Sequence, residues 1–468
     1  MFKKIVLWLL VLFTSPGVFA AEGDRVLIVV NDSFPDSVEV GGYYAAKRGV
    51  PEKNICHIRL PQNATVDLST YEKEILPAVK KSVDGTISYI VLTKDVPFRL
   101  EINGIIYCLD AFLCFPFQKI APNLEPYRYN EKTKEEQGYK GEKSQFFQRS
   151  GRYFSNGLRF LVTRLDGANK DIAKGLVDRA IYGEANITVK YGKGYFDQNG
   201  HTMGDTEQYQ TDLEIEKAYE LSKLKGFESD LNEVKAEYGK GECPDALWFY
   251  GWYKYNFYSD AFSWKPGAVG IHLDSASCLS PRSGPNWVAN ALKRGITATL
   301  GTVNEPYLDT FTKADIFYLK FLNGTNFAES VYYATSTSKW MMCVIGDPLY
   351  NPMGYNPQRI KDTAPVKFLS LYFNNDAMFP DSEIGITAEG DKYTGMEVEY
   401  GTVQASFQIK KDKIITLKHF ITVQDLKAGT EYFFRITLTD MHNNKQVKEG
   451  RFKTKERVLK IEKGMESE

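Results

Sequence analysis

The sequence predicts a doubly wound α/β domain with a mostly parallel sheet, followed by a small all-β sandwich. Three observations carry this prediction. In the first half of the chain, continuous apolar runs of strand length alternate with helical segments. The alternation resumes beyond a charged interval at 127–150. After residue 365 the pattern changes to short alternating segments separated by turn residues, which is typical of a sandwich.

The α/β domain is expected over 21–360, and its first strand is "RVLIVVN" (25–31), an apolar run typical of a strand buried on both faces. The remaining elements of this βαβαβ half are a helix from Asp36 or Ser37 to Gly49, a strand at 54–60, a helix disturbed near Pro77 and a strand at 87–97. Right-handed crossovers then place helices on both faces of a parallel sheet.

The second half begins after the charged segment 127–150, which is nearly free of aliphatic residues and predicts an exposed insertion. The expected elements are strands at 157–167 and 192–197, helices at 169–184 and 211–225, strands at 246–251, 268–274 and 295–303, and helices near 286–293 and 313–334. The sandwich is expected over 365–455, with a charged tail at 456–468. Tyr432, at a strand start after Gly429, is expected to form a tyrosine corner.

The first twenty residues predict an exported protein. Lys3 and Lys4 precede the apolar run at 5–13, a Ser-Pro-Gly sequence breaks it, and "VFA" (18–20) offers small residues for cleavage. The run is too short to span a bilayer comfortably, which favours a signal peptide (1–20) over an anchor, and no later stretch approaches the length of a membrane span. We therefore expect a periplasmic or extracellular protein without a transmembrane segment.

Composition limits the partners. With 58 Lys and Arg against 59 Asp and Glu, the chain gives no electrostatic reason to expect nucleic-acid binding. Six cysteines in an oxidising compartment predict disulfides: Cys108 and Cys114 could close a small loop, and Cys243 could reach Cys278, although spacing does not fix the connectivity. No metal site and no cofactor is expected, because "CLDAFLC" lacks partner His or Cys pairs and no nucleotide fingerprint occurs.

Segments along the α/β region resemble a family of uncharacterised exported bacterial proteins. The matching pieces are "VNDSFPDSVEVGGYYAAKRGVPEKNI" (30–55), "YIVLTKDVPFRL" (89–100), "VTRLDGANKDIAKGLVDRAIYGE" (162–184), "TVNEPYLD" (302–309) and "GDPLYNP" (346–352). More distantly, the layout is similar to the gingipain-like cysteine peptidases, which implies a caspase-like sheet or, more generally, a flavodoxin-like one. The C-terminal part resembles a fibronectin type III domain at "VEYGT" (398–402) and Tyr432, although no tryptophan follows Trp340.

The peptidase resemblance implies Cys278 as a nucleophile, in "HLDSASCLS" (272–280), but Trp252 stands where the base would be. Tryptophan cannot accept a proton. The alternative base is His272, six residues earlier, where an extended chain would place it about 20 Å away. These observations favour a Cys278 that is buried or disulfide-bonded and a His272 that belongs to the core.

Candidate ligand-binding residues fall at predicted strand ends, where open α/β sheets place their ligands. They are Trp252, Asp110, Arg164, Glu305 and Tyr307. Aromatic residues after Gly251 could form a rim for stacking sugar rings or peptide side chains. We therefore expect a non-peptidase binding protein of the cell envelope that takes a peptide or glycan. The alternative is a hydrolase that uses Cys278 as nucleophile, with His272 or a carboxylate as base.

Overall fold

The computed structural model describes residues 22–120, 128–130, 135–138, 140–143, 160–204, 206–234, 236–252, 254–354, 365–374, 382–403, 406–440 and 444–455. The expected signal peptide, the charged tail and most of the insertion lie outside these residues. Among the described residues, no helix is both long and apolar enough to cross a membrane.

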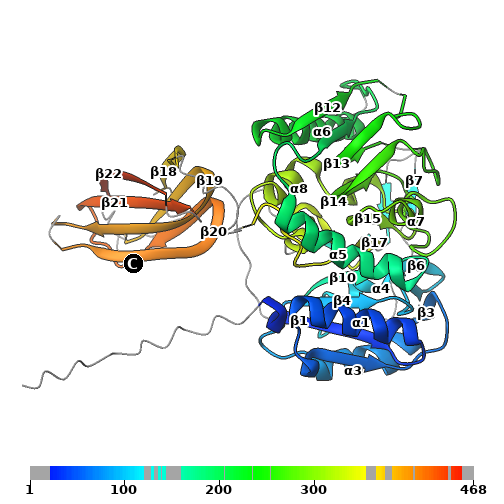
Figure 1. The fold of residues 1–468 in the computed structure, drawn as a ribbon. Helices are drawn as coiled ribbons and strands as arrows, with labels where there is room; N and C mark the ends of the chain where they lie inside the picture. Colours follow the sequence, from blue (N-terminus) through cyan, green and yellow to red (C-terminus); the bar gives the residue numbers. More distant parts are fainter. Residues whose placement is uncertain are drawn as a thin grey trace, which may run out of the picture.

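A large, mostly parallel sheet forms the centre of the α/β part (Figure 1). In spatial order its ten strands are β12 (Glu228–Asn232), β11 (Lys193–Asp197), β13 (Cys243–Gly251), β14 (Phe262–His272), β15 (Ala298–Thr302), β17 (Met342–Ile345), β10 (Leu161–Leu165), β4 (Tyr89–Thr93), β1 (Val26–Asn31) and β2 (Ile55–Ile58). β17 pairs antiparallel to β15 and meets β10 at one residue pair, Arg164 with Ile345. The prediction of a mostly parallel sheet is therefore confirmed.

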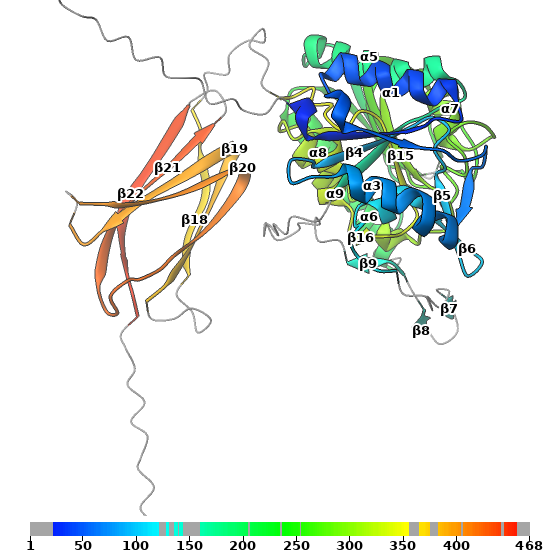
Figure 2. The same cartoon turned by 90° about the horizontal axis from the view of Figure 1, so that it is seen from below.

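Helices cover both faces of this sheet. Figure 2 shows α1 (Pro35–Arg48) and α5 (Lys170–Asn186) together on one side, with α3 (Leu76–Ser82) and α6 (Thr206–Leu224) on the other. All six residues of β1 are consequently buried, as its continuous apolar run predicted. The N-cap of α1 is Phe34, so the expectation of Asp36 or Ser37 as N-cap is wrong: Pro35, which fits the first helical position, starts the helix. The helix ends at Arg48 and Gly49 is its C-cap, whose φ of 66° suits a residue without a Cβ.

The remaining helices are α2 (Leu68–Thr70), α4 (Leu109–Leu113), α7 (Trp287–Lys293), α8 (Ala314–Phe321) and α9 (Phe327–Ala334). A π-helical turn at Tyr71–Ile75 joins α2 to α3. Pro77 lies in the first turn of α3. Proline offers no N–H to the preceding turn, and the wider turn before it accounts for the disturbance expected there.

Three small sheets accompany the large one. They join β3 (Thr65–Asp67), β5 (Arg99–Ile102) and β6 (Ile105–Cys108); β7 (Arg128–Asn130) and β8 (Glu135–Gln137); and β9 (Glu142–Lys143) and β16 (Thr337–Ser338). The last pair ties the described end of the insertion to the main body. A Cβ at Gly141 would lie 2.5 Å from the Thr337 side chain, so the chain passes close to β16 there.

The C-terminal part is an antiparallel unit with its own core. Its strands are β18 (Phe368–Asn374), β19 (Ile384–Gly401), β20 (Gln408–Val423), β21 (Glu431–Asp440) and β22 (Lys445–Lys453). Side chains along β21 alternate between buried and more exposed, and Ile436 and Leu438 are fully buried. The backbone N–H of Lys427 donates to the Tyr432 hydroxyl at 2.9 Å, which confirms the expected tyrosine corner.

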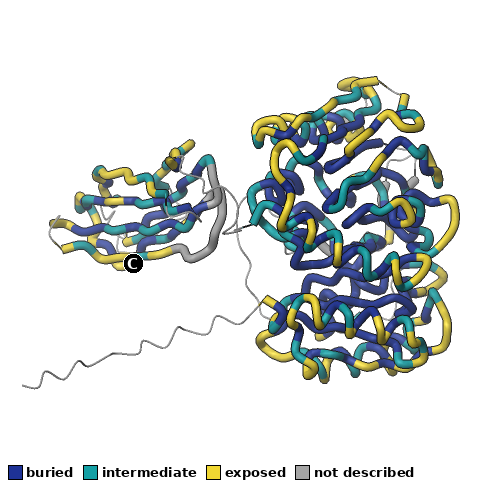
Figure 3. The backbone as a smooth tube through the Cα atoms, viewed as in Figure 1, coloured by how far each residue is buried: buried dark blue, intermediate teal, exposed yellow. Residues whose placement is uncertain are grey.

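Burial is deepest along the middle of the large sheet, where the tube in Figure 3 is dark blue, and the connecting loops are more exposed. The loops that follow β4, β10, β14 and β15 meet at one edge of the sheet. Arg282, in the loop after β14, donates to Asp166 after β10 and to the carbonyl of Val96 after β4. The N–H of Cys278 donates to Thr302 at the end of β15. This edge gathers most of the candidate residues.

Candidate functional site

Arg164 is a fully buried arginine at the end of β10, and two carboxylates hold it. Its Nε and Nη2 donate to the two oxygens of Asp110 at 2.8 and 2.6 Å, and its Nη1 donates to Asp166 at 2.9 Å. Backbone carbonyls of Val96 and Pro97 accept its other hydrogen bonds. Burial of two charges is tolerated when each is paired and hydrogen-bonded, as here. Asp110 and Arg164 therefore lie together, as expected of one site, but their side chains bind each other and not a ligand.

A second arginine completes this ionic network. Arg282, whose side chain is 19% exposed, donates from Nη2 to Asp166 at 2.9 Å. Arg164 and Arg282 both lie over the Phe98 ring, at 5.7 and 5.5 Å from its centroid. The two guanidinium groups and the two carboxylates are formally neutral together. Sequence reasoning missed Arg282, because nothing in the loop "SPRSG" (280–284) distinguishes it from a solvated arginine.

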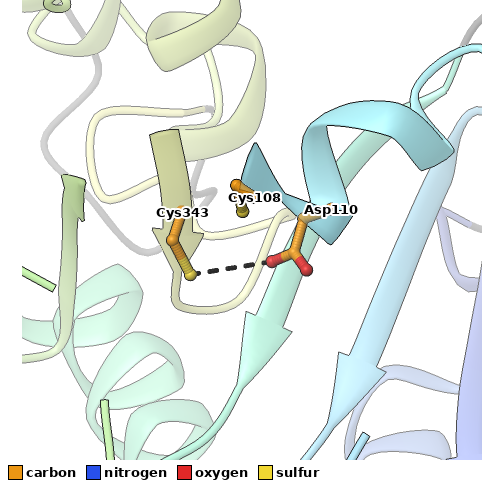
Figure 4. Close-up of side chains that lie close together, drawn as sticks. All are labelled: Cys108, Asp110 and Cys343. Atoms are coloured by element: carbon orange, nitrogen blue, oxygen red, sulfur yellow. Dashed lines mark hydrogen bonds between the residues drawn. The ribbon is translucent and has the colours of Figure 1, made fainter. Parts of the chain in front are cut away.

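Three buried thiols lie against this network. The Cys343 side chain of β17 lies close enough to those of Cys108 and Cys278 for them to affect its pKa, and its Sγ is 3.7 Å from Oδ2 of Asp110. Figure 4 shows Cys108, Asp110 and Cys343 approaching one another from different elements. One atom from each of these three residues lies within 4.8 Å of the other two. No pattern in the sequence marks Cys343, which is 235 residues from Cys108 and has no neighbouring cysteine.

All six cysteines are buried and free, so the expected disulfides are not formed. The short distance in sequence between Cys108 and Cys114 was misleading. Cys108 immediately precedes α4 and Cys114 follows it. The Cys114 thiol interacts with the Tyr332 hydroxyl at 3.3 Å, whereas the Cys108 thiol meets Cys343. The two side chains consequently point to different partners.

Cys278 and His272 have the wrong environments for an acid–base pair. Burial and its hydrogen bond to Cys343 raise the pKa of the Cys278 thiol well above its usual value, although Arg164 opposes the rise. His272 stacks on Trp287 at 5.2 Å and on Phe249 at 6.3 Å. Burial alone lowers the pKa of His272 to about 3, so the imidazole is neutral at physiological pH. The core interpretation of His272 fits this packing.

Trp252 does not line a rim. It is 8% exposed, and its indole N–H donates to Asp212 at 2.5 Å. The His201 ring lies 5.0 Å away and its Nδ1 is 3.3 Å from the same carboxylate. Gly251 before it must be small, since a Cβ there would lie 2.4 Å from the Cβ of Asp197. Trp252 therefore closes the end of β13 against α6, and the position has become part of the core.

The exposed residues at this edge lie slightly further along the chain. Tyr255 and Phe257 are 63% and 42% exposed, in the loop that leaves β13. The N–H of Asn256 between them donates to Asp274 at 2.9 Å. Burial raises the pKa of Asp274, and the nearby charge of Glu305 adds to the rise. Glu305 is exposed and Tyr307 is half-buried, so these two predicted residues remain at the surface.

Comparisons with known proteins give only weak similarities. No family model matches the chain, and no curated protein matches it. A solved protease structure is 11% identical, with 92% of this chain and 98% of that chain covered at a TM-score of 0.38. OgpA from Akkermansia muciniphila is 9% identical over 57% of this chain and 96% of that chain, at a TM-score of 0.17. The sixth fibronectin type III domain of a human fibronectin type III domain containing protein is 14% identical, over 20% of this chain and 91% of that chain, at a TM-score of 0.16.

Proposed function

We propose that this chain is an exported, non-peptidase protein that binds a glycan at the carboxyl edge of its large sheet. One observation carries the proposal. Two exposed aromatic rings, Tyr255 and Phe257, flank a backbone N–H that is anchored to Asp274, and Glu305 lies close enough to Asp274 to affect its pKa. Exposed rings on the same edge as an exposed carboxylate suit a sugar, whose apolar face stacks on the rings while its hydroxyls donate to Glu305. Asp274 is buried and holds the loop through Asn256.

The thiol does not support the alternative hydrolase. A thiol nucleophile needs a base or an environment that lowers its pKa. Cys278 is fully buried, and its thiol meets Cys343. The imidazole of His272 is held between aromatic rings. Trp252 also lies in the core, where an indole cannot accept a proton.

A peptide is the competing ligand, and the acidic groups around the loop indicate that such a peptide would be cationic. Glu237 has a raised pKa, caused by burial, opposed by Lys254 and increased by Asp274. Glu237, Asp274 and Glu305 are acidic groups of this edge, and Lys254 is a cation beside the Phe257 ring. The acidic excess would suit a cationic peptide. The Lys254 Nζ lies 4.9 Å from the centroid of the Phe257 ring, so a cation already occupies one face of this ring. A cationic peptide would have to approach beside that charge, and we therefore favour a neutral glycan.

Isothermal titration calorimetry of the mature chain tests the proposal. The probes are the neutral oligosaccharides chitotetraose, cellotetraose and maltotetraose, and the peptide tetralysine. We expect one of the sugars to bind and tetralysine to be inert. Tyr255→Ala and Phe257→Ala should each weaken sugar binding about three- to tenfold, since a stacking contact contributes about 0.5–1.5 kcal/mol.

The matched control is Tyr372→Ala, which removes a ring that is 65% exposed on β18. It should leave sugar binding unchanged. Tetralysine binding that is lost in Glu305→Gln would replace the glycan by a peptide, and no binding of any probe would contradict a binding role at this edge. Mass spectrometry of the tetralysine sample after incubation would reveal cleavage, which would restore the hydrolase.

Export is part of the same proposal and rests on the N-terminal sequence. We propose cleavage before Ala21 or Glu22, which releases a periplasmic or extracellular chain. The mass of the protein recovered outside the cytoplasm would give the mature N-terminus directly. An intact N-terminus on protein in the cytoplasmic fraction would contradict it.

A further inference from the structure

The buried thiols form a cluster that the proposed glycan site does not use. Cys108, Asp110 and Cys343 each place one potential ligand atom within 4.8 Å of the others (Figure 4). The Cys278 thiol lies close enough to Cys343 to affect its pKa. All four side chains are at most 1% exposed. Three thiols and a carboxylate from three separated segments thus converge in the interior.

We propose that Cys108, Cys278 and Cys343, with Asp110 facing them, form a binding site for a thiophilic d¹⁰ cation, Zn²⁺ or Cu⁺. Thiolates are the ligands that select these two ions, and four ligand atoms are the number that a closed structural zinc site uses. Cu⁺ needs fewer sulfur ligands than a four-coordinate Zn²⁺, so the same thiols can bind either ion.

The geometry requires only a small contraction. With Zn–S bonds of about 2.3 Å, two sulfurs of a tetrahedral site lie about 3.8 Å apart. The present separations of at most 4.8 Å among the Cys108, Asp110 and Cys343 atoms are larger by about 1 Å or less. Rotation about the cysteine side-chain bonds is sufficient for such a change. Cys278 is outside this group of three and must move towards it; its thiol lies close enough to Cys343 for the two to affect each other's pKa.

The backbone of each cysteine is held in place. The N–H of Cys108 donates to Trp340 at 2.9 Å, and the N–H of Cys278 donates to Thr302 at 3.0 Å. Cys343 pairs with Gly301 across the antiparallel ladder of β15 and β17. A Cβ at Gly301 would lie 3.0 Å from the Cβ of Cys278, so glycine there leaves room for this thiol. A site with fixed backbone positions loses little conformational entropy when the cation binds.

Charge balance also permits a buried cation. The neighbouring network of Asp110, Asp166, Arg164 and Arg282 is neutral, and the three thiols are neutral when protonated. Binding Zn²⁺ through all three sulfurs releases three thiol protons and adds one negative charge to the interior, and Cu⁺ bound through two sulfurs with release of two protons does the same. The guanidinium of Arg164 near Cys343 lowers the cost of that charge. Both oxygens of Asp110 already accept from Arg164, so the sulfurs supply most of the affinity. A hard cation such as Mg²⁺ or Ca²⁺ is not expected here.

The test uses Co²⁺ as a probe for Zn²⁺. The full chain, kept reduced and freed of metal with a chelator, is refolded with increasing Co²⁺ while absorbance is recorded. We expect one Co²⁺ per chain, with the intense near-ultraviolet bands of cobalt–thiolate bonds. Cys343→Ser, Cys108→Ser and Cys278→Ser should each weaken binding by more than the 10- to 100-fold that loss of an outer-shell partner costs. Cys243→Ser, which removes a buried thiol outside the cluster, should bind normally.

Elemental analysis and circular dichroism complete the experiment. Protein purified without chelator should contain one equivalent of zinc or of copper, and which metal is present identifies the ion. A variant that fails to fold by circular dichroism is replaced by the other two serine variants. A folded, reduced wild-type chain that takes up no cobalt, zinc or copper overturns the proposal. So does binding that persists in all three variants, or a disulfide between Cys343 and either partner in protein isolated without reductant.

Discussion

At the scale of single residues, burial decides the chemistry of the charged groups. Asp197, at the end of β11, is 3% exposed and accepts from the Asn232 side chain at 2.6 Å. Burial raises the pKa of Asp197 to about 7, against the help that Asn232 gives to its charged form. Arg164 is buried further, but two carboxylates compensate it. Asp197 and Arg164 differ in how far their burial is compensated: two carboxylates contact Arg164, whereas the partner of Asp197 is the neutral side chain of Asn232.

The raised pKa of Asp197 predicts a pH-dependent stability. The carboxyl group ionises near pH 4 when unfolded and near pH 7 when folded. Between these values the unfolded state loses its proton first, so the free energy of unfolding falls as pH rises, by up to roughly 4 kcal/mol. Asp197→Asn keeps an acceptor for Asn232 and removes the charge. Urea unfolding should show the variant close to wild type at pH 4 and more stable by several kcal/mol at pH 8.

The control for this experiment is Asp245→Asn, at a position in β13 whose side chain is 60% exposed. Its effect on stability should vary little between the two pH values. A stability difference between Asp197→Asn and wild type that does not grow with pH would show that Asp197 is ionised in the folded protein without cost.

At the scale of elements, the ends of strands and the turns before them fix the geometry of the sites. The loop after β14 carries Cys278 and Arg282, and each is held by a neighbouring strand end. β17 runs against β15 and thereby inserts Cys343 between Cys108 and Cys278. In the C-terminal unit, the corner before β21 is closed by the Tyr432 hydroxyl.

The tyrosine corner makes a prediction for this unit. Tyr432→Phe removes the acceptor for the Lys427 N–H and should lower the free energy of unfolding by about 1 kcal/mol. Tyr372→Phe, at an exposed position on β18, should have no effect. All six tryptophans lie at or before Trp340, so tryptophan fluorescence follows the α/β part, whereas only four of the 29 tyrosines lie in 365–455. The loss of stability in the C-terminal unit is therefore measured by circular dichroism on residues 365–455 produced alone. A shift in the tryptophan signal alone would contradict the assignment.

At the scale of the whole molecule, the chain contains separate hydrophobic cores. The core of the C-terminal strands includes Val366, Ile386, Val398, Ile436 and Leu438. Its members all come from residues 366–452, and none belongs to the cores of the large sheet. A unit with a complete core of its own meets the main requirement for folding independently.

We therefore expect residues 365–455, produced alone, to fold. The fragment should show a sheet-type circular dichroism spectrum and one cooperative urea transition, at nearly the midpoint that protection of residues 365–455 from hydrogen exchange gives for the full chain. The fragment carrying Tyr432→Phe should unfold earlier. A non-cooperative transition, or a midpoint far below that of the full chain, would mean that this unit depends on the rest of the protein.

The sequence alone determined the alternation of apolar strands and helices, the change of pattern after residue 365 and the corner at Tyr432. These depend on short-range periodicity and on turn chemistry, which neighbouring residues carry. It also placed Asp110, Arg164 and Cys278 at strand ends, and this is as far as local pattern reaches. Only the tertiary structure decided that Asp110 and Arg164 bind each other, that Trp252 and His272 are buried, and that Cys108 meets Cys343. Those outcomes depend on contacts between residues far apart in the chain, where packing and charge compensation select partners that spacing cannot show.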